Sequence, residues 1–478
     1  MQGALPTTAI DQPTSARLQS VLDDIVAGGE PDAIAAVITP DGTWAGAAGV
    51  DGPGGRAATA HDEFAIASIS KTFTAALVMH LAEQGKINLD RPLASYLQGA
   101  DANANNATVR QALAMRGGFG DTAPTVFDEV YADPTRAWTT AEVVSKIGPP
   151  LTPAGTEFHY SNPGYKLLGL AAEQVTGKSI STAMRDALLD PVHADGIVMQ
   201  DPDHLTPQPW ALPLKNFEGP LALTSYGKGS ALPCMSDATF SRNAAGMASD
   251  AASLARWGWL LFSNQILQPQ SLATMMTFDS DGHGIGVDKI PEYGPAAYGF
   301  SGSKPGYHSV LAVLPERNTV MVMFINNADS DELTAGGKLL DALQGTQPTS
   351  AGSESAGALA ARGDQSALDG VLRFAVDERE LLDGGASASD AKGNAGVWQM
   401  QVKDGAAEVT HPGGPPGSWT FTFDGPGVAL DFGTDGGALV GTYAIDGDNV
   451  RFRWDVHAGD PNPWIPKVLF AKAVRLKG

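Results

Sequence analysis

A serine lies three positions ahead of a lysine in the stretch Ser68-Ile69-Ser70-Lys71, at the start of a helical pattern. Residues three apart on a helix share one face, so the hydroxyl and the amine can meet. The exposed N–H groups of a helix N-terminus disfavour an ammonium ion, and a lysine desolvated there can accept the serine's proton. The alternative is that Ser68 only caps the helix and that Lys71 is solvated, which is the better interpretation of an isolated motif of this kind.

A second polar group, Tyr160-Ser161-Asn162, directly precedes another apolar helical pattern. In an extended loop Tyr160 and Asn162 point the same way, so a phenol that can transfer protons lies beside an amide that can hold a substrate carbonyl. Taken alone, the triplet is also typical of a turn with a buried aromatic ring. Its order along the chain gives it weight, because it follows Ser68 and precedes a glycine-rich strand at residues 298–304.

These two motifs and the segment YGFSGSKPGYHSVLAVLPE (residues 298–316), in this order, resemble the serine β-lactamase and penicillin-binding protein superfamily. The branch concerned contains class C β-lactamases, D,D-carboxypeptidases, D-aminopeptidases and family VIII esterases. The similarity extends over about residues 17–345 and includes the flanking segments INLDRPLASYL, YSNPGYKLLG and AGMASDAASLARW. It implies an α+β serine hydrolase domain, in which an antiparallel sheet is flanked by helices, a helical subdomain lies beside it, and the site lies between them.

The resemblance also implies an acyl-enzyme mechanism. Ser68 would attack a carbonyl, while Lys71 and Tyr160 would share the proton transfers. Asn162 would hold either the substrate's amide or the lysine. Ser303 matches the position whose backbone N–H joins that of Ser68 in an oxyanion hole, and the loss of one such donor costs about 3 kcal/mol of transition-state stabilisation.

The third motif departs from the family at its first position. That position usually carries lysine or histidine, which helps to recognise an anionic group, but this chain has Phe300 there. An aromatic residue occupies the position in some esterases and acyltransferases of the branch, so Phe300 argues against a carboxypeptidase or a β-lactamase. Lys304 or His308 can restore a positive charge from nearby, although an ordinary loop cation is the favoured interpretation of both.

The same strand is expected to line the substrate site. Gly302 has no side chain and therefore lets the strand approach a substrate closely. His159 is interpreted as a packing residue, and residues 117–131 as a wall of the cleft. The residues predicted to contact substrate are Asn162, Phe300, Ser301, Gly302, Ser303 and Lys304.

Composition excludes several classes of partner. Acidic residues outnumber basic ones 53 to 31, for a formal net charge of −22, and such a surface repels phosphate backbones and anionic headgroups. The only cysteine is Cys234, and the nine histidines lack paired-ligand spacing, so we expect no disulfide, no metal and no cofactor. We expect a small-molecule or peptide substrate and no nucleic acid, while the oligomeric state stays open.

The chain shows neither a signal-peptide pattern at its start nor about 18 consecutive apolar residues anywhere. We therefore expect no membrane insertion and a cytoplasmic protein, or an extracellular one if a leader was removed before this numbering begins.

The length of 478 residues allows two domains. Alternating apolar residues predict paired strands at 32–50 and 308–327, and helical spacing predicts a helix at 68–84 that ends at Gly85. The region from about 106 to 290 is predicted to be mostly helical, with helices at 140–147, 163–177, 179–189 and 250–263.

The last part of the chain changes character. Residues 346–364 are small and polar, which indicates a linker between a domain at 1–345 and a domain at 365–478. Beyond the linker, alternating segments separated by Asp-Gly turns predict a small antiparallel β-barrel, which resembles lipocalin-like appendages of some D-aminopeptidases and peptide-cyclising relatives.

The leading hypothesis is a serine hydrolase that acts through a Ser68 acyl-enzyme on a small ester, amide or D-residue peptide. One alternative is an acyltransferase or peptide cyclase of the penicillin-binding-protein type, which would pass the acyl group to an amine. The other is a ligand-binding module without catalysis on the same fold.

Overall fold

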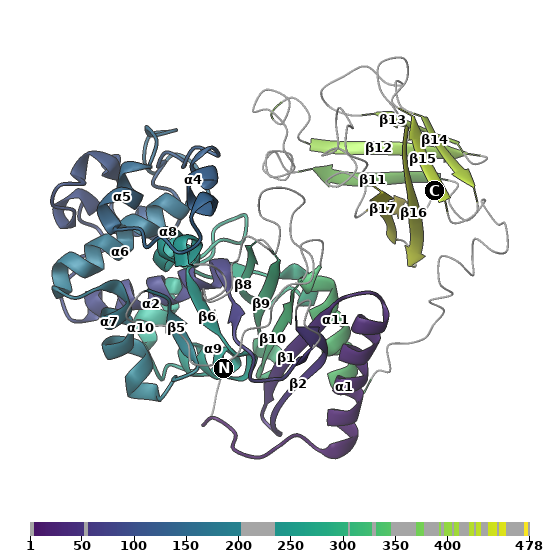
Figure 1. Ribbon diagram of the computed structural model, residues 1–478, viewed down its shortest axis with the longest axis horizontal. Coiled ribbons are helices and arrows are strands. Elements are labelled where there is room, and N and C mark those ends of the chain that lie inside the picture. The colour runs from purple at the N-terminus through teal and green to yellow at the C-terminus, as the bar shows by residue number, and fades with distance from the viewer. Residues whose placement is uncertain are drawn as a thin grey trace. The chain divides into compact units, whose positions relative to one another are not determined.

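The computed structural model describes residues 4–51, 56–201, 235–304, 306–326 and 331–345, together with Lys392 and the strands of the C-terminal region (Figure 1). The chain divides into two compact units, Met1–Gln347 and Pro348–Gly478. The predicted linker and Cys234 lie outside the described residues.

A seven-stranded antiparallel sheet forms the centre of the first unit, in the order β3-β2-β1-β10-β9-β8-β7. Its two central strands come from opposite ends of the unit, with Ile34 opposite Phe324. The predicted pairs at 32–50 and 308–327 are confirmed. The strands are β1 (Asp32–Thr39), β2 (Gly42–Asp51), β3 (Arg56–Ala57), β7 (Asp288–Lys289), β8 (Tyr298–Lys304), β9 (Tyr307–Leu314) and β10 (Thr319–Ile325).

Helices cover both faces of this sheet, which explains why its central strands are almost continuously apolar. On one face α1 (Gln12–Ala27) and α11 (Glu332–Leu343) pack side by side (Figure 1). On the other face lies α9 (Ala251–Phe262), and α2 (Ser70–Glu83) packs on it. Phe73 of α2 stacks on Trp257 of α9, with ring centroids 4.2 Å apart.

The region between β4 and β7 is largely helical, as the sequence predicts. A small sheet joins β4 (Phe64–Ala65), β6 (Met247–Ser249) and β5 (Ile197–Met199), in that order. The remaining helices are α3 (Val109–Leu113), α4 (Val126–Ala132), α5 (Thr140–Ser145), α6 (Asn162–Thr176), α7 (Ile180–Met184), α8 (Met235–Ala245) and α10 (Pro269–Met275).

The predicted helices correspond to α2, α5, α6 and α9, and the predicted α+β architecture with an antiparallel sheet flanked by helices is confirmed. Helix α6 begins where Ser161 Oγ accepts a hydrogen bond from the Gly164 N–H, and it ends at Gly177, which has a φ of 68°. The helix expected at 179–189 is instead two pieces, α7 followed by a π-helical turn at Arg185–Leu189. Helices α1, α3, α4, α8 and α10 were not individually predicted.

The second unit consists of antiparallel strands. Each strand pairs with the next one along the chain, and β18 pairs with β11 as well as with β17. Trp398 on β12 is fully buried. The strands are β11 (Gly370–Val376), β12 (Gly396–Lys403), β13 (Ala406–Thr410), β14 (Thr420–Asp424), β15 (Gly427–Asp431), β16 (Ala438–Asp446), β17 (Asn449–Asp455) and β18 (Ala473–Leu476).

Across the described ranges, every helix is either too short or too polar to cross a lipid bilayer.

Two neighbouring glycines of α11 give a matched test of how tightly this helix packs. A Cβ at Gly337 would meet only Tyr293 Cε1, at 3.9 Å, whereas a Cβ at Gly336 would collide with Tyr293 Oη and lie 2.7 Å from Met321 Cε. We predict that Gly337→Ala raises the free energy of unfolding by up to about 1 kcal/mol, because alanine favours a helix. Gly336→Ala should lower it by about 1–3 kcal/mol through overpacking. Urea unfolding measures both, and equal stability of the two variants would contradict the packing described.

Candidate active site

Ser68 lies in a one-turn 3-10 helix, η1 (Ala67–Ile69), that leads into α2. Ala67 has a φ of 44°, a conformation that costs a residue with a side chain roughly 1–3 kcal/mol and persists only where the surroundings enforce it. Ala67 and Ile69 are both fully buried, and Ile66 N–H donates to Met247 O at 3.1 Å. The packing on each side therefore fixes the direction in which Ser68 points.

Lys71 is buried on the first turn of α2 and bonds to three separate parts of the chain. Its Nζ lies 3.0 Å from Ser68 Oγ, 2.7 Å from Asn162 Oδ1 and 2.9 Å from Ala244 O. The amide and peptide oxygens can only accept, so they take two N–H groups of the amine. In the neutral amine the lone pair is then left for the Ser68 hydroxyl, which is the arrangement that a general base requires.

Tyr160 contacts the same hydroxyl from the other side. Its Oη donates to Ser68 Oγ at 2.6 Å, and Lys71 Nζ lies 4.6 Å from the centre of its ring. A phenol in this position can pass a proton between Ser68, Lys71 and a departing group. Nearby Tyr165 differs, because burial raises its pKa well above the usual value and its Oη donates to Leu113 O.

Strand β8 runs directly alongside the nucleophile. A Cβ at Gly302 would collide with Ile66 O and come within 3.0 Å of Ser68 N. Glycine is thus needed for the strand to approach the backbone of the nucleophile itself, whereas the sequence argument required it for approach to a substrate. This approach brings β8 to the Ser68 backbone, and the oxyanion hole expected from the N–H groups of Ser68 and Ser303 stays a prediction. The Ser301 and Ser303 side chains are exposed on the other face of the strand.

Phe300 and Lys304 share the face of β8 that carries Gly302, because side chains alternate along a strand. Phe300 is buried in the core beneath α2 and α9. Lys304 is also buried, and its Nζ lies 2.5 Å from Asp237 Oδ2 and 2.9 Å from Ala245 O. The cation proposed to compensate for Phe300 therefore already has a carboxylate partner.

The two histidines singled out in the sequence also lie against carboxylates. His308 Nδ1 lies 3.2 Å from Glu332 Oε2, and His159 Nε2 lies 3.3 Å from Asp121 Oδ2. Within residues 117–131, Phe119 is buried against the first turn of α6, where a Cβ at Gly164 would come within 2.7 Å of its ring. The role of this segment as a substrate wall stays a prediction.

Two residues of the site were not found by sequence reasoning, Asp237 and Lys166. Lys166 lies one turn after Asn162 on α6, is only 4% exposed, and has its Nζ 3.8 Å from the centre of the Phe240 ring. Burial lowers the pKa of Lys166 to about 7, although the charge of Asp237 opposes the shift. Asp237 belongs to none of the quoted segments, and Lys166 lies in YSNPGYKLLG but was not singled out there, because only the packing of α6, α8 and β8 brings the two residues together.

Comparison with known proteins identifies the family. The beta-lactamase family model matches residues 18–346, which is more than half of the chain. The chain belongs to the beta-lactamase family. The resemblance to the serine β-lactamase and penicillin-binding protein superfamily is thereby confirmed, and membership places the chain among serine hydrolases, as the sequence predicts.

Among curated relatives, Protein flp of Staphylococcus aureus (strain N315) is 31% identical over 140 residues. That match covers 27% of this chain and 27% of the relative, so the chain spans about a quarter of the length of the curated protein.

Two solved structures share the fold at low sequence identity. The D-amino acid amidase from Ochrobactrum anthropi SV3, complexed with L-phenylalanine amide, aligns with a TM-score of 0.58 and 21% identity, over 70% of this chain and 99% of that one. SurE with D-Leu aligns with a TM-score of 0.53 and 19% identity, over 98% of this chain and all of that one (100%).

Burial of Lys166 predicts a pH dependence of stability. Because its pKa is about 7 in the folded chain and near 10.5 when unfolded, the unfolded chain binds more protons between these values, and stability rises with pH there. We predict that Lys166→Met is more stable than wild type at pH 6 to 7 and that the difference shrinks towards pH 10. Urea unfolding at several pH values measures this. Lys338→Met, at an exposed position of α11, is the control, and a constant difference for Lys166→Met would contradict the prediction.

Proposed function

We propose that the protein forms an acyl-enzyme at Ser68 and acts as a hydrolase of small esters, amides or D-residue peptides. The observation that carries the proposal is the environment of one atom. Ser68 Oγ lies 3.0 Å from the amine of Lys71 and 2.6 Å from the phenol of Tyr160. A serine with a base on one side and a proton-transferring hydroxyl on the other is an activated nucleophile.

The reaction follows from these contacts. Lys71 takes the Ser68 proton as Oγ bonds to the substrate's carbonyl carbon, and the negative charge that develops on the carbonyl oxygen is stabilised by the N–H groups of Ser68 and Ser303. The bond to the leaving amine or alcohol then breaks, and Tyr160 relays the proton from Lys71 to it. Water next attacks the acyl group, gives up a proton by the same route, and Ser68 recovers its own.

The comparisons support a substrate with a D-configured residue. The Ochrobactrum enzyme is described as a D-amino acid amidase and has been captured with D-phenylalanine, and SurE has been captured with D-Leu. Phe300 supports a neutral group next to the scissile bond, because a buried aromatic ring cannot pair with a carboxylate. An amide or ester therefore suits the site better than a peptide with a free carboxylate.

A second candidate is acyl transfer to an amine, as in an acyltransferase or peptide cyclase. The likeness to SurE extends over both units of the chain and thus supports a two-domain protein. We accordingly propose a catalytic domain at 1–345, a linker at 346–364 and a small lipocalin-like β-barrel at 365–478. The barrel would then influence whether water or an amine receives the acyl group. Catalysis is favoured over a silent binding module, because a module has no need for Lys71 and Tyr160 at Ser68.

A fluorophosphonate probe tests the nucleophile. We expect mass spectrometry to locate one adduct on Ser68 in the wild type and none in Ser68→Ala. Ser145→Ala, an exposed serine on α5, is the matched control and should label normally. Absence of both an adduct and ester turnover in the wild type would favour the binding module.

Analysis of the products from a D-residue peptide thioester separates hydrolysis from acyl transfer. Free acid as the product supports hydrolysis, whereas a macrocycle supports acyl transfer.

Replacement of Phe300 tests the substrate preference. We predict weak turnover of β-lactams and of D-Ala-D-Ala peptides by the wild type, and a rise in kcat/KM of about tenfold for these anionic substrates in Phe300→His, because the imidazole introduces a donor that can be protonated. Turnover of a neutral amide should not rise in parallel. Strong carboxypeptidase activity of the wild type would contradict the proposed preference for neutral substrates.

A further inference from the structure

We propose that Lys304 and Asp237 are positioning residues for acylation. Their buried ion pair holds a turn at residues 242–246, and the carbonyl groups of this turn orient Lys71 towards Ser68. The inference rests on the acyl-enzyme function proposed above. The place of Lys304 in the third motif suggested that it binds substrate. The proposal gives it a different role.

The 242–246 turn presents three successive carbonyl oxygens to the catalytic elements. Asn243 O accepts from Thr74 Oγ1 at 2.7 Å, and Ala244 O accepts from Lys71 Nζ at 2.9 Å, so both bind side chains of α2. Ala245 O accepts from Lys304 Nζ at 2.9 Å and so binds a side chain of β8. Two lysines on different elements are therefore held by neighbouring peptide groups, and a shift of the turn moves both.

The turn has a strained backbone, so it needs support from outside. Arg242 has a φ of 48° inside α8, a value that a residue with a side chain rarely adopts. After this break the carbonyls of the next three residues accept from side chains of α2 and β8. The chain then folds back tightly, since Gly246 N–H donates to Arg242 O at 2.5 Å and a Cβ at Gly246 would collide with Ala238 O.

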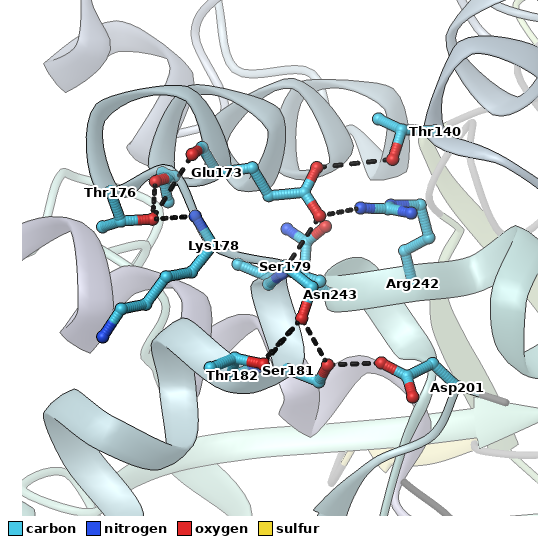
Figure 2. A network of polar contacts seen from close by, with 12 residues as sticks. Thr140, Glu173, Thr176, Lys178, Ser179, Ser181, Thr182, Asp201, Arg242 and Asn243 are labelled. Atoms are coloured by element: carbon cyan, nitrogen blue, oxygen red, sulfur yellow. Dashed lines mark hydrogen bonds and ion pairs between the residues drawn. The ribbon is translucent and has the colours of Figure 1, made fainter. Parts of the chain in front are cut away.

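Two ion pairs supply that support, one from each neighbouring element. Arg242 bonds to Glu173 Oε1 at 2.7 Å, and Figure 2 shows this carboxylate between Arg242 and Thr140. Glu173 belongs to α6, the helix that also carries Asn162. On the other side Lys304 bonds to Asp237 at 2.5 Å, with both side chains 5% exposed. Arg242 fixes the turn to α6, and Lys304 fixes it to β8.

The pair also sets the charge near Lys71. Adjacent carbonyls bind the two amines, so the Nζ atoms of Lys71 and Lys304 lie within roughly 11 Å of one another, given ~3.8 Å between successive Cα atoms. Removal of one buried charge at that distance shifts the pH at which Lys71 loses its proton by up to about one unit, at an effective dielectric constant of about 20. Within the described residues, Lys166, Arg242 and Glu173 also lie near the pair and the turn, and the phenols of Tyr160 and Tyr165 lie near Lys71.

The two partners should therefore shift the pH dependence of acylation in opposite directions. Without the positive charge of Lys304, Lys71 holds its proton more strongly, and a higher pH is needed before it can act as a base. Without the negative charge of Asp237, it releases the proton more readily and a lower pH suffices. If the two residues had a purely structural role, their removal would lower the rate equally at every pH and would not move the midpoint of the profile in either direction.

The experiment measures the rate of fluorophosphonate labelling of Ser68 between pH 5 and 10 in the full chain. In Lys304→Met we expect a rate lowered about tenfold, with the midpoint of the profile moved upwards. In Asp237→Asn, which keeps the shape and an acceptor oxygen, we expect the midpoint to move downwards. Lys304→Arg should restore the wild-type midpoint, and the double variant Lys304→Met/Asp237→Asn should lie near it with the rate still low.

Lys338→Met is the matched control and should leave the profile unchanged. Midpoints that stay in place, or that move the same way in both single variants, overturn the proposal. If Lys304→Met does not fold, Asp237→Asn and Lys304→Arg still decide the matter. Absence of labelling in the wild type refutes the acyl-enzyme function instead, so the two failures are distinguishable.

Discussion

The contacts of Lys71 Nζ constrain much of the first unit. A buried amine must have its N–H groups satisfied, and the two acceptors are Asn162 Oδ1 at the start of α6 and Ala244 O at the end of α8, while Ser68 of η1 is the third contact. These elements lie far apart in the sequence. The helical region between β4 and β7 is thus more than a cover for the sheet, because it supplies both oxygen atoms that hold the amine so that its lone pair can face Ser68.

Strand β8 complements this arrangement from the side of the sheet. The pleat places Phe300, Gly302 and Lys304 on one face, and each contributes something different. Gly302 allows the strand to approach the backbone of Ser68, Phe300 packs in the apolar core, and Lys304 anchors α8. One short strand therefore links the proposed oxyanion hole to the turn that holds Lys71, and a displacement of the strand affects both.

The sequence predicted what is local and left open what depends on distant partners. Ser68 and Lys71 are three residues apart on one turn, so their contact could be read from spacing. The partners of Lys304 and His308 could not be predicted in this way, because they are Asp237 and Glu332, which no sequence pattern connects to them. Helix α1 carried a signal that went unused, with Asp11 as its cap and apolar residues at helical spacing. Helix α8 is interrupted by the positive φ of Arg242, which no propensity predicts.

The buried charges around α8 differ from the charges on the surface in how strongly they interact. The chain as a whole carries −22, yet the buried lysines within the described ranges, Lys71, Lys166 and Lys304, all lie around α8. Acidic groups on the surface are screened by water and salt, whereas buried charges interact strongly over the same distance. Among the buried carboxylates of the described residues, Asp237 is the one that pairs with Lys304 beside α8. The ion pair of Lys304 and Asp237 therefore acts on its neighbours far more strongly than a pair of exposed charges would at the same distance.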